Sequence, residues 1–415
     1  MKNNYIEKAS FSNLKVIKKE KEYKLNEQPF GVLTNDENDP LFSVSVSNSS
    51  LSIDIWSGCS YGCKYCHVQG IYHYIKDNNG MRKCPIRDGK YDIYEIITSL
   101  LNHPFFEKNE TIISIATGST EPFGSAKVSK STIEIINELV KRKCYNPIWI
   151  VTKAGIPEQH IQDLVNIAKK GIKIMISICW AGNPKEIEPI QNNRFKNIEK
   201  LKNNDNIFIA WYMRPLVKEW GANKSNLIKM FEYVNDNYKD CIDFIVPGGL
   251  RWTSGIEYAL TEINNIKLPN LIKNDNKKTL DNNIIKLINK LSYKYFPNIP
   301  VFYNSSCALS NMLQKSNISL SNNRKNNGCK FSRCPYIQTQ RCNKCMIIND
   351  FNEIEEELNG MGINIKFKMI DLNKNIIKSI PELNSFNYTI KQVIIKKIAK
   401  YQNKLSQEKC HELVE

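Results

Sequence analysis

The stretch that decides the fold of this chain is Trp56-Ser57-Gly58-Cys59-Ser60-Tyr61-Gly62-Cys63-Lys64-Tyr65-Cys66-His67. It continues a run of alternating apolar residues, 51–56, which predicts a β-strand. Its two glycines allow the backbone to turn tightly after that strand. Three residues separate the first two cysteines, and two residues separate the second from the third. The stretch therefore predicts a strand followed by a tight loop that carries three thiols.

These three thiols predict a metal centre. Three thiolates on one short loop can hold three corners of a four-iron cluster and leave the fourth iron open. A structural zinc site is normally closed by a fourth ligand nearby, and none follows Cys66 at zinc spacing. An open iron–sulfur cluster at Cys59, Cys63 and Cys66 is our first interpretation. Zinc, and cysteines with a purely structural role, are the alternatives.

Length and composition set the broad class. The 415 residues suggest one large domain with appendages, or two to three domains. No apolar run is long enough to cross a bilayer, and residues 1–20 are polar and lysine-rich, without an apolar signal core. We therefore expect a cytoplasmic protein that does not enter a membrane. In that compartment its 13 cysteines indicate metal or cluster ligation rather than disulfides.

The charge of the chain favours an anionic partner. Lys and Arg number 58 against 42 Asp and Glu, a formal net charge of +16. Such an excess is typical of proteins that contact nucleic acid. The alternative explanation of the positive charge is that the whole chain is rich in Asn and Lys.

From residue 51 onward, strand-like and helix-like patterns alternate. Strands are predicted at 51–56, 111–117, 147–152, 172–179, 207–213 and 242–247, and helices at 91–102, 130–143, 158–170, 194–203 and 225–238. Ser131 and Ser225 are candidate N-caps, Pro157 is expected to start a helix, and Gly171 to end one. This alternation predicts parallel βα units, an α/β fold whose site lies in the loops after the strands.

Polar side chains stand at five consecutive strand ends. They are Glu121, Lys153, Ser177, Arg214 and Arg251. A single polar residue after a strand usually belongs to a turn. Five in a row, with one acid, three bases and one hydroxyl, suit a zwitterionic ligand.

The cysteine spacing, with the aromatic Tyr65 before the last cysteine, resembles the radical S-adenosylmethionine (SAM) enzymes. Residues 120–123, Thr152-Lys153, 176–177 and 214–216 are similar to the spore photoproduct lyase-like branch of that superfamily. The resemblance covers about residues 50–255. It implies a partial (β/α)6 barrel of the TIM type.

The resemblance also implies an activity. SAM would bind the open iron, and one electron from the cluster would cleave it to methionine and a 5′-deoxyadenosyl radical, which abstracts hydrogen from a substrate. Ser119, Lys153 and Ser177 would contact SAM, Tyr65 its adenine, and Arg214 would belong to the same cofactor site. An external donor such as flavodoxin or ferredoxin would supply the electron.

One departure from that branch concerns the substrate. The photoproduct lyase uses a cysteine at the end of its second strand as a hydrogen donor, and residues 115–118 here contain none. Thymine-dimer repair by that mechanism is therefore not expected.

A second group of cysteines follows the predicted barrel. Cys329, Cys334, Cys342 and Cys345 are separated by four, seven and two residues. Four thiolates fit either zinc or an iron–sulfur cluster. We favour a second four-iron cluster, because only the last two cysteines have the pair spacing of zinc ribbons and radical SAM enzymes of several branches carry auxiliary clusters.

Cys307 is a fifth thiol that could replace a ligand, donate hydrogen, or pack as a small apolar side chain. The remaining cysteines (84, 144, 179, 241 and 410) are expected to be inert.

The predicted organisation has four parts. Residues 1–50 form an N-terminal extension, with strand-like pieces at 30–33 and 42–46 that are expected to cover a barrel end. Residues 51–300 form the core barrel, and 301–349 the cysteine-rich segment, with a further strand at 299–304. Residues 350–415 form a small basic α+β region. It ends in an amphipathic helix, 389–405, whose lysines (Lys391, Lys396, Lys397, Lys400 and Lys404) are either solvated or contact phosphates.

The functional hypothesis is a radical SAM enzyme that acts on a nucleic acid or nucleotide. The alternative is a radical SAM enzyme for a peptide or small metabolite, with the second cluster accepting an electron. A third hypothesis is a non-catalytic protein that binds nucleic acid and contains an iron–sulfur cluster or zinc. The polar residues at the strand ends disfavour this hypothesis.

Overall fold

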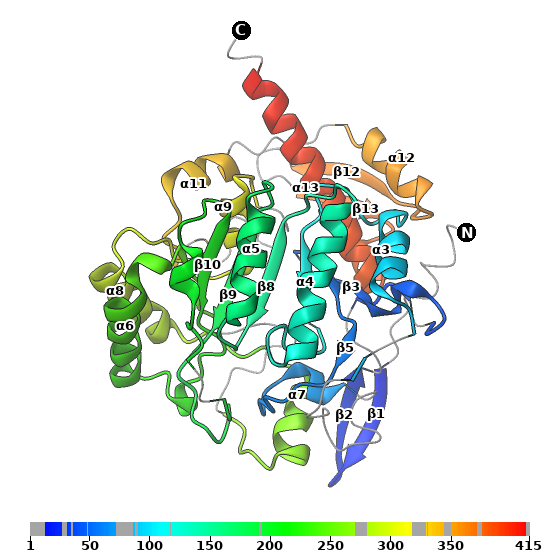
Figure 1. The fold of residues 1–415 in the computed structure, drawn as a ribbon. Helices are drawn as coiled ribbons and strands as arrows, with labels where there is room; N and C mark the ends of the chain where they lie inside the picture. The colour runs from blue at the N-terminus through cyan, green and yellow to red at the C-terminus, as the bar shows by residue number, and fades with distance from the viewer. Residues whose placement is uncertain are drawn as a thin grey trace.

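A computed structural model of the chain describes residues 13–26, 31–34, 36–47, 49–71, 86–87, 90–116, 118–190, 193–269, 280–317, 329, 331–343, 350–371 and 376–411. Its centre is a seven-stranded sheet in the order β11-β10-β9-β8-β7-β4-β3. Figure 1 shows β10, β9 and β8 of this sheet side by side. The strands are β3 (Val44–Val46), β4 (Leu51–Ile53), β7 (Ile113–Ile115), β8 (Ile148–Thr152), β9 (Ile174–Cys179), β10 (Ile207–Tyr212) and β11 (Phe244–Ile245). All neighbours from β4 to β11 are parallel. The predicted α/β class is confirmed, and each of the six predicted strands contains a strand of this sheet.

Alternation along each strand divides the core between the two faces of the sheet. In β9 every residue is buried, as expected for a parallel strand that is covered on both sides. Ile174, Ile176 and Ile178 join the cluster that includes the surrounding helices, whereas Met175 and Cys179 join a separate cluster on the other face. Successive side chains of a strand point to opposite faces, so one face serves the helices and the other an interior.

The connecting helices cover the outer face. They are α3 (Ile93–Leu101), α4 (Ala126–Lys141), α5 (Ile161–Ala168) and α6 (Lys224–Tyr238), with α8 (Asn282–Tyr295) beside α6. Pro157 precedes the turn η3 (Glu158–His160) that leads into α5, and Gly171 follows α5 with φ 88°, so both of these predictions are confirmed.

Three details of the helix predictions were wrong. α4 begins earlier than expected and is capped by Ser125, so Ser131 lies inside it. α6 is capped by Asn223 rather than by Ser225. Residues 194–203 form only the short turn η4 (Ile198–Leu201), because Asn197 adopts a left-handed φ of 69° that a continuous helix does not allow.

The interior face is covered by α9 (Ser305–Leu313). Ala308, Leu309 and Met312 of this helix pack in the cluster that contains Met175, and the Met312 carbonyl accepts a hydrogen bond of 3.1 Å from the ammonium of Lys173, just before β9. The helix therefore ends at the amino ends of the strands. The predicted strand 299–304 is reduced to bridges of Val301 with β11 and with Arg333.

The N-terminal segment departs from its prediction. Residues 44–46 are not part of a cover; they pair antiparallel with β4 as the edge strand β3, because Val44 and Val46 are buried in the main core. Residues 27–30 lie outside the described part of the chain. The hairpin of β1 (Asn13–Lys18) and β2 (Lys21–Asn26) packs instead on α7 (Ser254–Tyr258).

The C-terminal region forms its own small core. It contains α12 (Asn352–Gly360), β12 (Lys366–Asp371), β13 (Ile376–Ile380) and α13 (Tyr388–His411). The apolar residues of α13 pack on α12, as its amphipathic pattern predicts.

The remaining elements are β5 (Trp56–Ser57), β6 (Ile86–Arg87) and α11 (Tyr336–Asn343). No helix in the described part of the chain has the length and apolar character required to cross a membrane.

The lysines of α13 do not form one solvated face. Lys397 is only 4% exposed and pairs with Glu107 and Glu357. Lys396 donates to the carbonyl of Ser50 at 3.0 Å, and Lys400 pairs with Glu107 at 2.9 Å. The contacts with Glu107 and Ser50, which come just before strands of the main sheet, join α13 to it, whereas Glu357 joins Lys397 to α12. Lys396 and Lys397 are therefore not solvated, and a phosphate-contacting role for this helix stays a prediction.

The cap of α4 gives a test of this fold. Ser125→Ala removes the hydroxyl that accepts from the Val128 amide and should lower the free energy of unfolding by about 1 kcal/mol. The matched variant Ser131→Ala, inside the same helix, should change it little, because alanine is the better helix former. Urea unfolding followed by circular dichroism measures both. A larger loss in Ser131→Ala would contradict the observed start of α4.

Candidate functional site

A cavity of about 440 Å³ lies where the loops after the parallel strands meet. All three cysteines of the 59–66 loop line it, together with Ser119 after β7, Lys153 after β8, Cys179 at the end of β9 and Arg214 after β10. Parallel strands bring their carboxyl ends to one edge, which explains why residues as far apart in the sequence as Cys59 and Arg214 meet here. The structure thus brings together most of the residues that the sequence singled out.

The cysteine loop is fixed by the backbone. Gly58 and Gly62 have φ of 94° and 61°, in the left-handed region that favours glycine. The Gly58 amide donates to the Ser119 carbonyl at 3.2 Å, and the Thr120 hydroxyl donates to the Gly58 carbonyl. The Lys64 amide donates to the Ile187 carbonyl at 3.0 Å. The loop is therefore held from two sides before any ligand binds.

The three thiols sit in a poorly solvated place. Burial raises the pKa of Cys59 to about 12, and it also raises the pKa of Cys63 and Cys66, although the nearby Lys153 opposes the shift. Without a metal these groups are therefore neutral thiols at physiological pH. A metal centre supplies the positive charge that thiolates need here, and its binding would release protons.

The described residues contain no group of three or more His, Cys, Asp or Glu side chains gathered as ligands of one metal ion. A mononuclear site at the 59–66 loop is therefore not preformed. A four-iron cluster makes a different demand, because each cysteine binds a separate iron.

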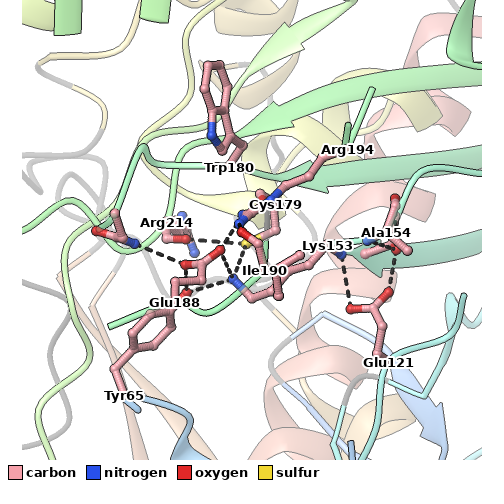
Figure 2. A network of polar contacts seen from close by, with 12 residues as sticks. Tyr65, Glu121, Lys153, Ala154, Cys179, Trp180, Glu188, Ile190, Arg194 and Arg214 are labelled. Atoms are coloured by element: carbon pink, nitrogen blue, oxygen red, sulfur yellow. Dashed lines mark hydrogen bonds and ion pairs between the residues drawn. The ribbon is translucent and has the colours of Figure 1, made fainter. Parts of the chain in front are cut away.

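A buried carboxylate organises the wall of the cavity (Figure 2). Glu188, which is 1% exposed, pairs with Arg194 and with Lys153, the latter at 3.4 Å. It also accepts hydrogen bonds from the hydroxyl of Tyr65 and, at 3.1 Å, from the amide of Asn183. The Lys153 ammonium donates to the Tyr65 hydroxyl at 2.7 Å. One carboxylate thus fixes both the lysine and the tyrosine of the cysteine loop.

The charges of this network compensate one another. Burial alone would raise the pKa of Glu188, but the charges of Lys153 and Arg194 outweigh it and lower the pKa. Burial alone would lower the pKa of Lys153, but the thiol of Cys179 and the carboxylate of Glu188 raise it. Burial, followed by the charge of Glu188, raises the pKa of Tyr65 well above its usual value. Glu188 is therefore a carboxylate, Lys153 an ammonium and Tyr65 a neutral phenol.

A second buried carboxylate, Glu121, holds the end of β8. It accepts from the Thr152 hydroxyl and, at 3.0 Å, from the Lys153 amide (Figure 2). Burial raises the pKa of Glu121, and these two donors oppose the shift. Glu121, which follows β7, thus positions the backbone at the end of β8.

Arg214 supplies positive charge on the β10 side. Its guanidinium donates to the Tyr212 hydroxyl at 2.7 Å and lies 4.4 Å from the centre of that ring. Its buried Nε has no hydrogen-bond partner among the described residues. A Cβ at Gly248 would collide with this guanidinium, so the glycine provides the space that it occupies. Arg214 is therefore placed in a fitted recess with a donor left over.

Two residues of β9 differ from their predictions. Ser177 is fully buried and does not line the cavity; its hydroxyl accepts from the Trp149 indole at 3.0 Å, and Trp149 lines the cavity in its place. Cys179, expected to be inert, does line the cavity and lies 3.4 Å from the Lys153 ammonium. Both side chains face the interior, but only the one at the strand end reaches the cavity.

Sequence analysis missed Glu188 and Arg194 as site residues. Both lie between β9 and β10 outside the helices and strands, and Arg194 entered the sequence analysis only as the first residue of the helix wrongly predicted at 194–203. Two charged residues close to a predicted site were the only available signal.

The second group of cysteines is not gathered as the ligands of one metal ion in the described part of the chain. Cys329, Cys334 and Cys342 are close enough to Cys307 to interact with it electrostatically. Cys345 lies outside the described residues.

Comparison with protein-family models found no match, and a search of curated proteins found none either.

The Glu188 network predicts a large and pH-dependent effect on stability. Glu188→Gln leaves two buried cations without a counter-charge and should lower the free energy of unfolding by about 3–5 kcal/mol. Because the folded state lowers the pKa of Glu188 from 4.5, its contribution is fully present above pH 4.5 and is lost as the pH falls through the lower, folded pKa. The difference between the two proteins should therefore be constant above pH 4.5 and shrink below it.

Urea unfolding from pH 3 to 8 measures this difference. The matched variant is Glu158→Gln, which breaks an exposed ion pair with Lys200 and should cost about 1 kcal/mol or less. Equal losses in the two variants, or a loss in Glu188→Gln that grows towards low pH, would show that Glu188 is not a compensated carboxylate.

Proposed function

We propose that this protein is a radical SAM enzyme, built on a partial (β/α)6 barrel, in which Cys59, Cys63 and Cys66 hold a four-iron cluster with one open iron. The observation that carries the proposal is the convergence of all three cysteines with Ser119, Lys153 and Arg214 on one cavity. The spacing of the cysteines alone suggested the cluster. The cavity that the cysteines share with Ser119, Lys153 and Arg214 adds space and charge for a ligand beside the cluster.

The donor set of the cavity fits such a cluster. Its three thiols come from one loop that hydrogen bonds hold in place, and no fourth cysteine stands beside them in that loop. Their raised pKa values mean that they become thiolates only when a metal compensates the charge. The cavity volume of about 440 Å³ lies in the usual range for a site of a small organic ligand.

The cavity also fits the charges of an amino-acid ligand. Arg214 and Arg251 line it, whereas the charge of Lys153 is compensated by Glu188. Such a positive charge would attract a carboxylate. Because Lys153 is already bonded to Tyr65 and Glu188, we assign it to positioning Tyr65 rather than to direct binding.

The chain's own residues would prepare the site for radical chemistry. When bound, the cluster supplies the electron that cleaves SAM and so generates a 5′-deoxyadenosyl radical. Tyr65 stacks on Trp220 with ring centres 5.7 Å apart, which closes one wall with aromatic surface. Leu250 and Ile256 line the cavity as apolar groups. These residues exclude water, which protects a reactive species from side reactions.

The substrate we propose is a nucleic acid or nucleotide, on the strength of the net charge of +16. The contacts of Lys396 and Lys397 with the main sheet remove two lysines from that argument, so the charge rests on the rest of the surface. A peptide or small metabolite is the second candidate. An external flavodoxin- or ferredoxin-like protein would deliver the electron.

The proposal predicts SAM cleavage that depends on the loop. Anaerobically reconstituted, reduced protein should convert SAM to 5′-deoxyadenosine, and Cys63→Ala should abolish this because the cluster loses one of three ligands. Chromatography of the products measures the cleavage. The matched control is Cys241→Ala, a buried cysteine in the core away from the cavity, which should retain activity.

The two variants together decide the assignment. Cleavage that survives in Cys63→Ala, or that disappears equally in Cys241→Ala, would contradict the role of the 59–66 loop. Circular dichroism of both variants checks that the fold is intact.

A further inference from the structure

A second cavity, of about 310 Å³, lies between α13 and the amino ends of β4 and β7, and we call it the α13 cavity. Leu51, which begins β4, and Ile112, which directly precedes β7, both line it. Val393 lines it from α13, and Leu313 from the end of α9. The C-terminal region, the main sheet and α9 therefore each supply part of its wall.

The α13 cavity is distinct from the cavity that the cysteines line. Among the described residues the two share only Ser49, in the segment between β3 and β4, so they adjoin there. No residue that was assigned above to the cluster or to SAM lines the α13 cavity. It is therefore a separate candidate site.

Lysines supply the charge of the α13 cavity. In the described part of the chain, those that line it are Lys315, Lys396, Lys397 and Lys400. All of them except Lys396 form ion pairs with carboxylates. The carboxylate partners are Glu107, Glu110 and Glu357. Three carboxylates thus balance three of the four lysines, and one positive charge is left over.

Lys396 is the lysine without a carboxylate. Its ammonium forms no ion pair with the described residues and donates to the Ser50 carbonyl at 3.0 Å. The side chain is half-buried. Burial lowers the pKa of Lys396 to about 7, although the charge of Glu107 opposes the shift. An anion beside this ammonium would supply the missing charge and raise its pKa again.

The rest of the wall is largely apolar. Its apolar side chains include Val46, Leu51, Phe105, Ile112, Leu313 and Val393. A phosphate group carries up to two negative charges and three acceptor oxygens, more than one uncompensated ammonium can balance. A carboxylate carries a single charge. The apolar wall suits a hydrocarbon part attached to it.

We propose that the α13 cavity binds a small monocarboxylate with an apolar body, whose carboxylate pairs with Lys396 and whose hydrocarbon part packs on the apolar wall. The volume of about 310 Å³ lies at the lower end of the usual range for small-molecule sites. The bound ligand contacts α13, α9 and the main sheet together, so it stabilises their packing. The site is independent of the proposed function and exists whether or not the protein cleaves SAM.

The site makes binding depend on pH. The charged groups of the lining around Lys396 come from α13, from the segment before β7 and from the segment after α9: Lys397, Lys400, Glu107, Glu110 and Lys315. Lys396 loses its proton as the pH rises through about 7, and the charge that attracts the carboxylate is lost with it. The affinity should therefore fall by about tenfold or more between pH 7 and pH 9.

Isothermal titration calorimetry of the full chain tests the proposal with octanoate, hexanoate and phenylacetate as probes. Two compounds separate the contributions to octanoate binding, because 1-octanol lacks the charge and acetate lacks the apolar body. Each should bind at least about tenfold more weakly than octanoate. The melting temperature of the chain should rise with octanoate concentration.

Lys396→Met keeps the length of the side chain and removes its charge. It should weaken octanoate binding by about tenfold or more and abolish its dependence on pH. The matched control is Lys391→Met, on the same helix but outside the lining of the cavity, which should bind octanoate as the unaltered chain does.

The proposal is wrong if none of the three carboxylates binds more tightly than about 1 mM. It is also wrong if Lys396→Met binds octanoate unchanged, if 1-octanol binds as well as octanoate, or if inorganic phosphate binds more tightly than octanoate. Circular dichroism checks the fold of both variants. If Lys396→Met does not fold, the pH dependence and the comparison with 1-octanol in the unaltered chain decide the question.

Discussion

The parallel hydrogen-bonded ladder from β4 to β11 is the constraint on which the rest of the structure depends. Because the strands run the same way, their carboxyl ends share one edge, and because side chains alternate, each strand gives one face to the helices and one to the interior. Ser119, Lys153 and Arg214 are distant in sequence and meet only through this arrangement. The cysteine loop follows the first parallel strand, so it lies on the same edge.

Charge compensation holds the side chains of this edge in place. Glu188 is buried at a position where an isolated carboxylate would be protonated, and Lys153 and Arg194 keep it ionised. Its hydrogen bond with Tyr65 then ties the cysteine loop to the segment between β9 and β10. On the other side, Glu121 ties the end of β7 to the end of β8. The wall is thus prepared before a ligand arrives, which is what a site for reactive chemistry requires.

The sequence predicted what depends on local pattern and missed what depends on distant contact. Buried parallel strands are nearly continuous apolar runs, so all six predicted strands were found, and Gly171 ended its helix as expected. Glu188 stands in irregular backbone, where no periodicity exists to reveal it. Lys397 looked like part of a solvated face because its partners, Glu107 and Glu357, come from other segments. The sequence left three roles open for Cys307, and the path of α9 brings it to Cys329.

The central claim is that one cavity holds both a cluster on the 59–66 loop and SAM beside it. A crystal structure of the anaerobically reconstituted protein with SAM, with data collected at the iron absorption edge, tests it most directly. The account predicts an anomalous iron peak bonded to Cys59, Cys63 and Cys66, with the methionine part of SAM on the open iron and near Arg214. The absence of iron at these three cysteines, or SAM bound outside the cavity, would contradict it.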